Sequence, residues 1–472
     1  MREATDAGTE SWQVLVLRRN GSELLVFEHG DGIALPRLTI PQHARVAHAL
    51  NAQIKSGWDL DVFSLYPLQP ATASLGNHTV RCHVVEAIRH DAIAPRMAQW
   101  SSVSTLSDRR FRDAADLASI CRWRDLVGLP GSNGVSVPFG NPGCLTQIQT
   151  WIRQALLPWE LHLTERFVQF TASKSFSLIR FDTNERAIWF KAVGEPNLRE
   201  LPISRELARR FPTFVPAILG VHENWNAWLT LEAEGNHPDE HSGLETWTRI
   251  SAALADLQIA SIGNSLHFID AGCRDMRVPS VAKVVEPYFE TMADLMEEQP
   301  KKIPPPMTRK DIKSLQNHVL EALAHLDKAA LPNSLGHLDF NPGNILVNEG
   351  RVVFLDWSAG CVGCPLWTLE YLLERLRRFH PTNDRWRTEV LSAYLDPWRC
   401  LVRPDELKLA LTTAPLLAVF AYAVASGTWR DPQRLQDPEI AGHLRSLTRR
   451  MNREAAGWLD SMNSRSTCAA HG

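Results

Sequence analysis

The sequence predicts an α+β protein built from more than one domain. The chain has 472 residues, which is more than one ordinary domain holds, so we expect two or three domains. Most segments with strand-like alternation precede residue 235, and most segments with helical spacing follow it. Residues 128–143 are dense in glycine, proline, serine and asparagine, and they separate an N-terminal α+β segment from the rest.

The composition is that of a soluble globular protein, with 44% hydrophobic and 22% charged residues. A net charge of −3 gives no general attraction to nucleic acid or to an anionic membrane. The N-terminus lacks the apolar region of a signal peptide, and the apolar residues 409–425 are too few and too interrupted to span a membrane. Eight cysteines without a disulfide-framework spacing indicate reduced thiols. We therefore expect a cytoplasmic protein without nucleic-acid or membrane partners.

Residues 1–128 form the first predicted domain. An asparagine–glycine turn at residues 19–21 joins two strands, a helix covers residues 46–54, and a further strand covers residues 78–87. This order is weakly similar to the Nudix domain. The acidic residues that Nudix enzymes carry on their metal-binding helix are absent, and the helix has in their place Asn51, Gln53 and Lys55.

Without those carboxylates the domain has no evident means of binding the Mg²⁺ that pyrophosphate cleavage uses. We expect a non-hydrolytic accessory module that binds a ligand, covers another part of the protein or forms a homodimer. An α+β domain with no ligand at all is an equal alternative. A nucleotide hydrolase regulated by the rest of the chain is the remaining alternative.

The next unit is β-rich. A helix over residues 145–157 precedes strands over residues 167–170, 176–181 and 187–191, and the small polar loop 171–175 joins the first two strands. Lys191 ends the third strand. A helix over residues 202–211 carries Glu206, and a later strand leads into Glu232 and Ala233.

A short hairpin in the second part of the chain gathers three polar side chains. Apolar residues 345–347 and 352–355 flank a turn, and this pattern predicts two strands. Asp339 and Asn344 precede the hairpin and Asp356 follows it. Two carboxylates and an amide are suitable oxygen ligands for a hard cation such as Mg²⁺. Such a group also serves phosphoryl transfer, whose barrier falls through positioning and charge neutralisation.

His337-x-Asp339-x₄-Asn344, followed by Asp356-Trp357, resembles the catalytic and metal-binding segments of the aminoglycoside phosphotransferase and choline kinase-like family. The resemblance covers residues 145–465 and implies the two-lobed protein-kinase-like fold. A small β-rich lobe would span 145–235 and a large helical lobe 236–463. A linker at 129–144 would precede them, and a disordered tail at 464–472 would follow.

The resemblance also implies roles. Asp339 would be the catalytic base, with Asn344 and Asp356 holding Mg²⁺. Lys191 would bind phosphates of ATP or GTP, held by Glu206, with Glu200 as the second choice. The remaining nucleotide contacts would come from the loop and the hinge, at Ser173, Lys174, Ser175, Glu232 and Ala233. His337 would fix the loop through hydrogen bonds.

Three departures from the family pattern bear on this prediction. The phosphate loop has no glycine, Gln258 stands where the family has histidine, and Thr368 stands where it has aspartate. The short path after Asp356 favours a small-molecule kinase over a protein kinase. We therefore expect a phosphotransferase acting on a hydroxyl of a small molecule, and a pseudokinase-type binding module is the alternative. The acceptor stays open, since a cationic aminoglycoside needs an acid-lined pocket that the sequence does not reveal.

Overall fold

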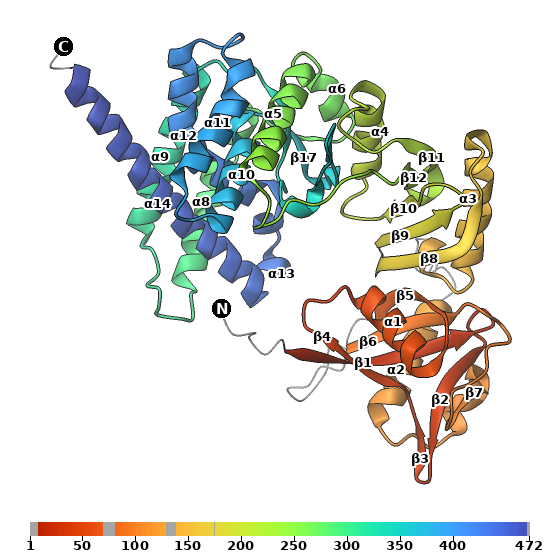
Figure 1. Ribbon diagram of the computed structural model, residues 1–472. Coiled ribbons are helices and arrows are strands. Elements are labelled where there is room, and N and C mark those ends of the chain that lie inside the picture. Colours follow the sequence, from red (N-terminus) through yellow and green to blue (C-terminus); the bar gives the residue numbers. More distant parts are fainter. Residues whose placement is uncertain (1–7, 69–80, 129–137, 174, 470–472) are drawn as a thin grey trace. The chain divides into compact units, whose positions relative to one another are not determined.

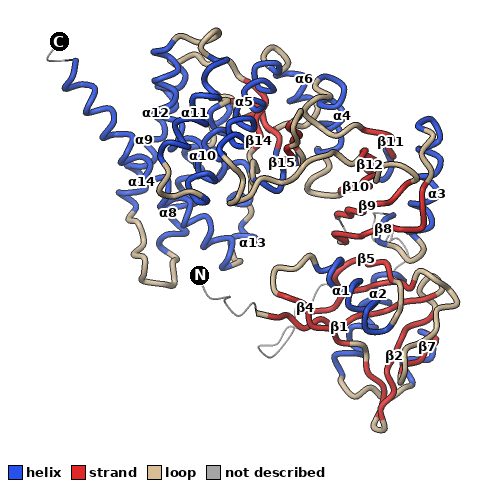
Figure 2. The backbone as a smooth tube through the Cα atoms, in the orientation of Figure 1, coloured by secondary structure: helices blue, strands red, loops and turns tan. Residues whose placement is uncertain are grey.

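A computed structural model describes residues 8–68, 81–128, 138–173 and 175–469 (Figure 1). The chain divides into two compact units, of which the first comprises Met1–Leu201 and Ala217–Glu232. The second comprises Pro202–Pro216 and Ala233–Gly472. Helices dominate the second unit and strands dominate the first (Figure 2), so the predicted α+β class is confirmed.

The N-terminal part of the first unit is a mixed sheet with two helices. Its path runs β3-β2-β1-β6-β5, with β4 paired to β1 and β7 to β2, and β1 runs parallel to β6. The elements are β1 (Thr9–Arg18), β2 (Glu23–His29), β3 (Gly32–Ala34), β4 (Arg37–Pro41), α1 (Val46–Trp58), β5 (Val62–Leu68), β6 (Arg81–Ala87), β7 (Ala98–Ser102) and α2 (Ala114–Gly128). The predicted first hairpin and helix are confirmed, and the Nudix resemblance stays a prediction.

The remaining part of the first unit is an antiparallel sheet of five strands in the order β11-β12-β10-β9-β8. The strands are β8 (Leu163–Ala172), β9 (Phe176–Thr183), β10 (Ile188–Val193), β11 (Ile218–His222) and β12 (Ala227–Leu231). The lead-in helix α3 (Cys144–Leu156) buries Ile148 and Ile152 in the same core as Ile179 and Phe190 of the sheet. The three predicted strands and the lead-in helix are therefore present.

Gln169 of β8 joins the two sheets of this unit. The side chain is 3% exposed, and its Nε2 donates to the carbonyl of Ser64 at 2.8 Å. Its Oε1 accepts from the Ser64 amide at 2.7 Å and from Asn51 Nδ2 at 3.1 Å. Asn51 also accepts from Ser64 Oγ at 2.8 Å. Asn51 of α1 and Gln169 of β8 thus serve the packing of the two sheets against each other.

We expect Gln169→Ala to lower the free energy of unfolding of the protein by about 2–4 kcal/mol, because it leaves both backbone groups of buried Ser64 without their partner. Chemical denaturation of the full chain measures the change. Gln154→Ala, on the exposed surface of α3, is the matched control and should change the stability by less than about 0.5 kcal/mol. If the two substitutions changed the stability equally, the hydrogen bonds of Gln169 to Ser64 would not stabilise the protein.

The second unit is a helical lobe with two short sheets. Its main helices are α4 (Glu200–Arg210), α5 (Leu244–Ser261), α8 (Val285–Glu297), α9 (Arg309–Lys328), α10 (Leu366–Phe379), α11 (Asp384–Trp398), α12 (Pro404–Ala425) and α14 (Pro438–Ala469). Shorter helices are α6 (Ser265–Asp270), α7 (Val278–Ala282) and α13 (Pro432–Leu435). One sheet has the strand order β13-β17-β14, and the other pairs β15 with β16. The strands are β13 (Arg274–Met276), β14 (Ser334–His337), β15 (Ile345–Val347), β16 (Val352–Phe354) and β17 (Gly360–Gly363).

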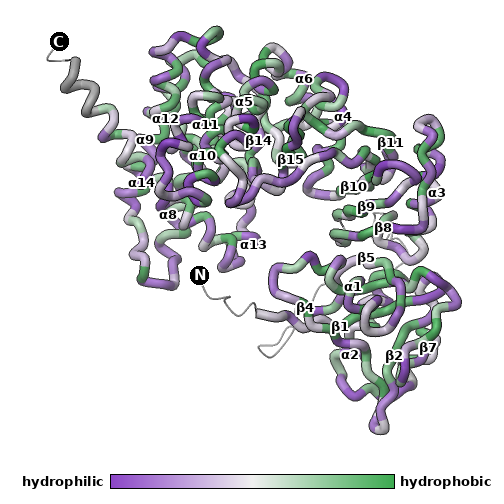
Figure 3. The backbone as a smooth tube through the Cα atoms, in the orientation of Figure 1, coloured by the Kyte–Doolittle hydropathy of each residue, from purple (hydrophilic) through white to green (hydrophobic). Residues whose placement is uncertain are grey.

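The helices bury a common core. Trp247 and Leu254 of α5, Leu315 of α9 and Leu417 of α12 all belong to it, and polar residues interrupt the hydrophobic ones along the helices (Figure 3). Among the described residues, α12 alone has the length and composition of a membrane span, and 67% of that window is buried inside the structure. The expectation that the apolar segment is too short and too interrupted for a span is therefore wrong by length and composition, because α12 extends to Pro404, although most of its apolar window packs inside the lobe.

The C-terminal prediction needs a correction. We expected a disordered tail from residue 464, but α14 continues to Ala469, and residues 470–472 lie outside the described part of the chain. No proline or glycine interrupts residues 458–469, so nothing in the local sequence forces the helix to end earlier. Most of the predicted linker, residues 129–137, also lies outside the described residues.

Candidate active site

The predicted hairpin is present as β15 and β16. Ile345 pairs with Phe354 and Val347 with Val352. The Asn348 amide donates to the carbonyl of Arg351 at 3.0 Å and closes the turn. At the open end, the Leu355 amide donates to the carbonyl of Asn344 at 2.8 Å. Asn344 therefore precedes one strand and Asp356 follows the other at the same end of the hairpin.

Asp339 lies in the loop between β14 and the hairpin, where two amide side chains hold it. Asn344 Nδ2 donates to the Asp339 carbonyl at 2.9 Å and to its Oδ2 at 3.3 Å. Asn341 Nδ2 donates to Asp339 Oδ1 at 3.0 Å and to its carbonyl at 3.1 Å. We did not single out Asn341 from the sequence, although Asp-x-Asn is a pattern in which an asparagine reaches back to nearby backbone. The geometry brings Asp339 and Asn344 together.

Asp356 adopts a left-handed backbone conformation, with φ 57° and ψ 65°. Such a conformation is uncommon for a residue other than glycine and is tolerated best by asparagine and aspartate. Ser358 Oγ donates to Asp356 Oδ1 at 3.0 Å. The described residues contain no group of three or more His, Cys, Asp or Glu side chains able to hold a metal ion. A Mg²⁺ site here would instead combine the carboxylate of Asp356 with the amide oxygen of Asn344, oxygen donors that suit a hard cation.

His337 ties the loop to the hairpin. The side chain is 1% exposed, its Nε2 donates to the carbonyl of Leu355 at 3.0 Å, and its Nδ1 accepts from the Asp339 amide at 3.2 Å. Burial lowers the pKa of His337 against the opposing effect of the Leu355 carbonyl, so the imidazole is neutral at physiological pH. This arrangement agrees with the structural role predicted for His337.

Thr368 of α10, at the position where the resemblance implies an aspartate, supports the loop that leads to Asp339. Its Oγ1 accepts from the His337 amide at 3.0 Å, and the side chain is 1% exposed. A hydroxyl oxygen satisfies this buried amide as a carboxylate would, without adding a negative charge to those of Asp339 and Asp356. The departure from the family pattern therefore keeps the loop hydrogen-bonded.

We expect Thr368→Val to destabilise the protein by about 1–3 kcal/mol, because it preserves the shape of the side chain but leaves the His337 amide unsatisfied. Thr368→Ser keeps the hydroxyl and is the matched control. Thermal or chemical denaturation compares the two variants. If the valine variant were as stable as the serine variant, the hydrogen bond from the His337 amide to residue 368 would not contribute to stability.

Lys191 pairs with Glu200 and not with Glu206, so that prediction was wrong. The Lys191 and Glu200 side chains are 14% and 3% exposed and form an ion pair. Glu206 instead accepts from Arg209 at 2.7 Å and also pairs with Arg210. The hydrogen bond from Arg209 and the charge of Arg210 lower the pKa of Glu206 to about 2, although burial opposes the shift. The two glutamates are six residues apart on α4 and are therefore rotated by about 240° around the helix axis.

This correction gives a test. We expect Glu200→Gln to weaken nucleotide binding at least about tenfold, because Lys191 loses the partner that holds it extended, and to destabilise the protein, since breaking a buried pair costs about 3–5 kcal/mol. Titration with nucleotide measures the affinity. Glu206→Gln is the control and should change the affinity less than about twofold, since Glu206 pairs with Arg209 and Arg210 and not with Lys191. A larger loss of nucleotide affinity in Glu206→Gln than in Glu200→Gln would instead support Glu206 as the partner of Lys191.

The predicted phosphate loop uses its own polar groups internally. The Ser173 amide donates to the carbonyl of Phe176 at 2.8 Å, and the Ser175 amide donates to Ser173 Oγ at 3.2 Å. The Ser175 carbonyl accepts from the Gly194 amide at 2.7 Å. Lys174 lies outside the described residues. The amides of Ser173 and Ser175 are therefore already satisfied in this conformation.

The predicted hinge coincides with the boundary between the two compact units, which falls between Glu232 and Ala233. The Glu232 amide donates to the carbonyl of Ala187 at 2.9 Å, and its carbonyl accepts from Arg186 Nη2 at 2.8 Å. Its carboxylate accepts two hydrogen bonds from Arg180, at 2.6 and 2.9 Å. Glu232 is thus committed to the sheet of the first unit, which leaves Ala233 as the candidate for contact with the nucleotide base.

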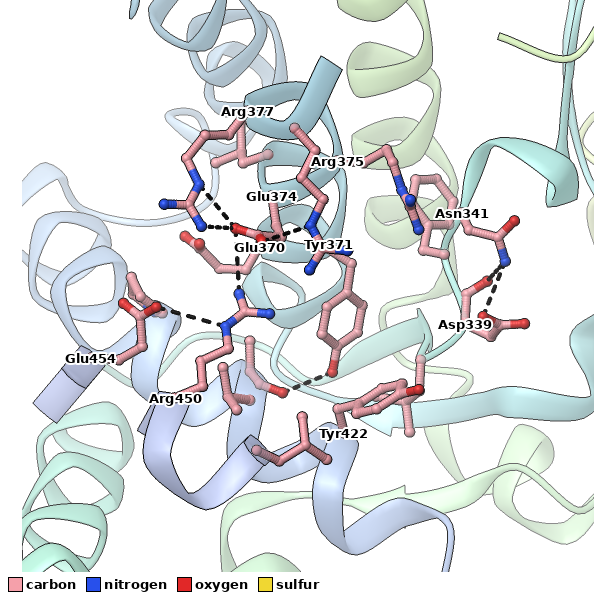
Figure 4. Close-up of a pocket in the computed structure, with 18 of the residues that line it drawn as sticks. Asp339, Asn341, Glu370, Tyr371, Glu374, Arg375, Arg377, Tyr422, Arg450 and Glu454 are labelled. Atoms are coloured by element: carbon pink, nitrogen blue, oxygen red, sulfur yellow. Dashed lines mark hydrogen bonds and ion pairs between the residues drawn. The ribbon is translucent and has the colours of Figure 1, made fainter. Parts of the chain in front are cut away.

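A cavity of about 450 Å³ opens beside Asp339 and Asn341 within the second unit (Figure 4). Most of its other lining residues come from α10 and α14, including Tyr371 and Arg450. Asp339 also borders a second cavity of about 470 Å³ with a mainly apolar lining that includes Leu444. Space for a small molecule therefore adjoins the predicted catalytic carboxylate.

Comparison with known proteins finds similarity to phosphotransferases over part of the chain. The family model described as the phosphotransferase enzyme family matches residues 198–406. No curated protein sequence matches the chain. Similar solved structures include a macrolide 2′-phosphotransferase from Brachybacterium faecium, with 17% identity over 62% of this chain and 98% of that chain and a TM-score of 0.40. The choline kinase LicA from Streptococcus pneumoniae has 14% identity over 66% and 99%, with a TM-score of 0.42.

An ethanolamine kinase from Plasmodium vivax has 12% identity over 73% of this chain and 89% of that chain, with a TM-score of 0.44. The residues matched by the family model include the loop of Asp339, the hairpin and the helix that supports them. The family model of the phosphotransferase enzyme family thus matches residues 198–406, which lie within the span 145–465 of the resemblance drawn from the sequence, and it agrees with the predicted kinase-like fold and enzyme class.

Proposed function

We propose that this protein transfers the γ-phosphoryl group of ATP or GTP to a hydroxyl group of a small molecule, with Mg²⁺ as cofactor. The observation that carries the proposal is the joint placement of Asp339 and Asn344 at the open end of a hairpin that ends in Asp356. Magnesium would neutralise phosphate charge when bound by Asn344 and Asp356.

The protein's own residues have distinct tasks in this mechanism. Asp339 orients the acceptor hydroxyl and accepts its proton, while the amide of Asn341 fixes the carboxylate. His337 and Thr368 hold the loop backbone in place. Lys191, extended by Glu200, stabilises negative charge on the nucleotide phosphates. Ala233 contacts the base. The same proposal includes action in the cytoplasm and a covering or dimerising role for the N-terminal domain.

One observation favours the alternative of a binding module without turnover. The amides of Ser173 and Ser175 are engaged inside their own loop, whereas a kinase uses this loop to cover phosphates. If binding alone were the function, nucleotide would stabilise the protein but would not be consumed.

The deciding experiment is a screen of small hydroxyl compounds with ATP and GTP in parallel, following nucleotide consumption and the appearance of phosphorylated product. Phosphoryl transfer that requires Mg²⁺ supports the proposal. Nucleotide binding without any consumption, across the whole screen and with both nucleotides, overturns it in favour of the binding module.

A further inference from the structure

The cavity beside Asp339 is not the acid-lined pocket that a cationic aminoglycoside would need. Five arginines and four carboxylates line it. The arginines are Arg375, Arg377, Arg378, Arg387 and Arg450, and the carboxylates are Asp339, Glu370, Glu374 and Glu454. Since Asp339 is assigned to the acceptor hydroxyl, the arginines outnumber the carboxylates that remain to bind the rest of an acceptor.

One carboxylate collects three of the arginines. Glu374 accepts from Arg377 at 3.0 Å and from Arg378 at 2.9 Å, and Arg450 lies 3.5 Å from it (Figure 4). Burial and the charge of Arg450 act in opposite directions on Glu374, and its pKa is lowered, so it stays ionised. A single negative charge cannot neutralise three guanidinium groups, and Glu454, 3.8 Å from Arg450, adds one more.

The remaining carboxylate, Glu370, contributes less than a full negative charge. Burial raises the pKa of Glu370 to about 7, although the charge of Arg387 opposes the shift. Glu370 is therefore partly protonated at neutral pH. Within the described part of the chain, neither Arg375 nor Arg387 has a carboxylate at ion-pair distance. Arg375 is partly buried, whereas Arg387 is exposed.

We propose that the acceptor carries an anionic group, a carboxylate or a phosphate, in addition to the hydroxyl that is phosphorylated, and that Arg375 binds this group. The inference rests on the proposed function, since it takes Asp339 as the point at which the hydroxyl lies. Guanidinium groups suit carboxylates and phosphates because they present two parallel donors. A polycationic acceptor would meet like charge in the same cavity, which costs affinity.

The test uses the full-length protein with size-matched sets of small hydroxyl compounds. Glycerate and glycerol 3-phosphate represent the anionic set, glycerol the neutral set and ethanolamine the cationic set. Phosphoryl transfer and equilibrium binding are measured for each, with wild type, Arg375→Ala and Arg375→Glu. Arg385→Ala is the control, since Arg385 is 80% exposed and pairs with Glu389 outside the cavity lining.

We expect the anionic set to be preferred by at least about tenfold in kcat/KM. Loss of hydrogen bonds between charged groups should raise KM for anionic acceptors by about 10–100-fold in Arg375→Ala, with less effect on kcat and none on neutral compounds. Arg375→Glu should shift the preference toward the cationic set, and the control should match wild type. The carboxylate and phosphate members of the anionic set distinguish the two possible anions.

The two proposals fail in different ways. Asp339-dependent phosphorylation of neutral or cationic compounds, with no preference for the anionic set, overturns this inference and supports the proposed function. Binding of the anionic set that depends on Arg375 without any phosphoryl transfer overturns the proposed function but keeps the anion site. The inference is also overturned if the anionic, neutral and cationic sets do not differ in either turnover or binding.

Discussion

Asp339→Asn is expected to lower kcat for phosphoryl transfer by about 10²–10⁴-fold, the usual contribution of a positioned general base. Asparagine has nearly the shape of aspartate and retains one oxygen for the hydrogen bond from Asn341. It cannot take up the proton of the acceptor hydroxyl. The loss should therefore appear in kcat, whereas the affinity for nucleotide stays close to that of wild type.

Steady-state kinetics with an acceptor from the screen measure the change, and denaturation confirms that the variant is folded. Asp327→Asn is the matched control, since Asp327 lies exposed on α9 of the same unit and should retain wild-type turnover. A normal kcat for Asp339→Asn in a folded protein would remove Asp339 from the mechanism, and with it the basis of the proposed function.

The parts of the site that the sequence predicts well are local. Apolar runs on either side of a short polar turn predict β15 and β16, and the hairpin then brings Asn344 to the end at which Asp356 follows. Few residues separate the partners, so periodicity and turn chemistry suffice. The predicted lead-in helix and the three strands with Lys191 were found for the same reason.

The parts that the sequence missed depend on contacts made after folding. The partner of Lys191 depends on where α4 begins and which of its faces meets β10, and spacing alone does not separate Glu200 from Glu206. The arginine-rich cavity joins α10 to α14, whose charged residues Glu374 and Arg450 are far apart in the chain. No single segment of the sequence carries that pattern.

A similar limit applies to the N-terminal domain. The absence of carboxylates on α1 was visible in the sequence, and it argued against hydrolysis. The hydrogen bond from Asn51 to Gln169 could not be predicted, because the two residues are 118 positions apart in the chain. Polar side chains that satisfy one another across two sheets leave no periodic signal in either strand, so only the folded chain reveals that these groups serve packing.

Asp356→Asn is the second substitution with a large expected effect, and it separates metal binding from proton transfer. Asparagine tolerates the left-handed backbone conformation of residue 356, so the hairpin should keep its structure. The substitution removes a negative charge from the proposed cation site. We expect kcat/KM to fall by about 10²-fold or more, as when one preorganised electrostatic contact is lost, and the Mg²⁺ concentration for half-maximal rate to rise.

The measurement is the initial rate as a function of Mg²⁺ at a fixed nucleotide concentration, compared with Ser358→Ala. That control removes the hydrogen bond to Asp356 Oδ1 but keeps the carboxylate, so it should shift the Mg²⁺ dependence far less. Asp339→Asn, by contrast, should lower the rate at every Mg²⁺ concentration without moving the midpoint as far. An unchanged Mg²⁺ dependence in Asp356→Asn would mean that the carboxylate after β16 does not bind the cation, because a ligand cannot lose its charge without weakening the site that it forms.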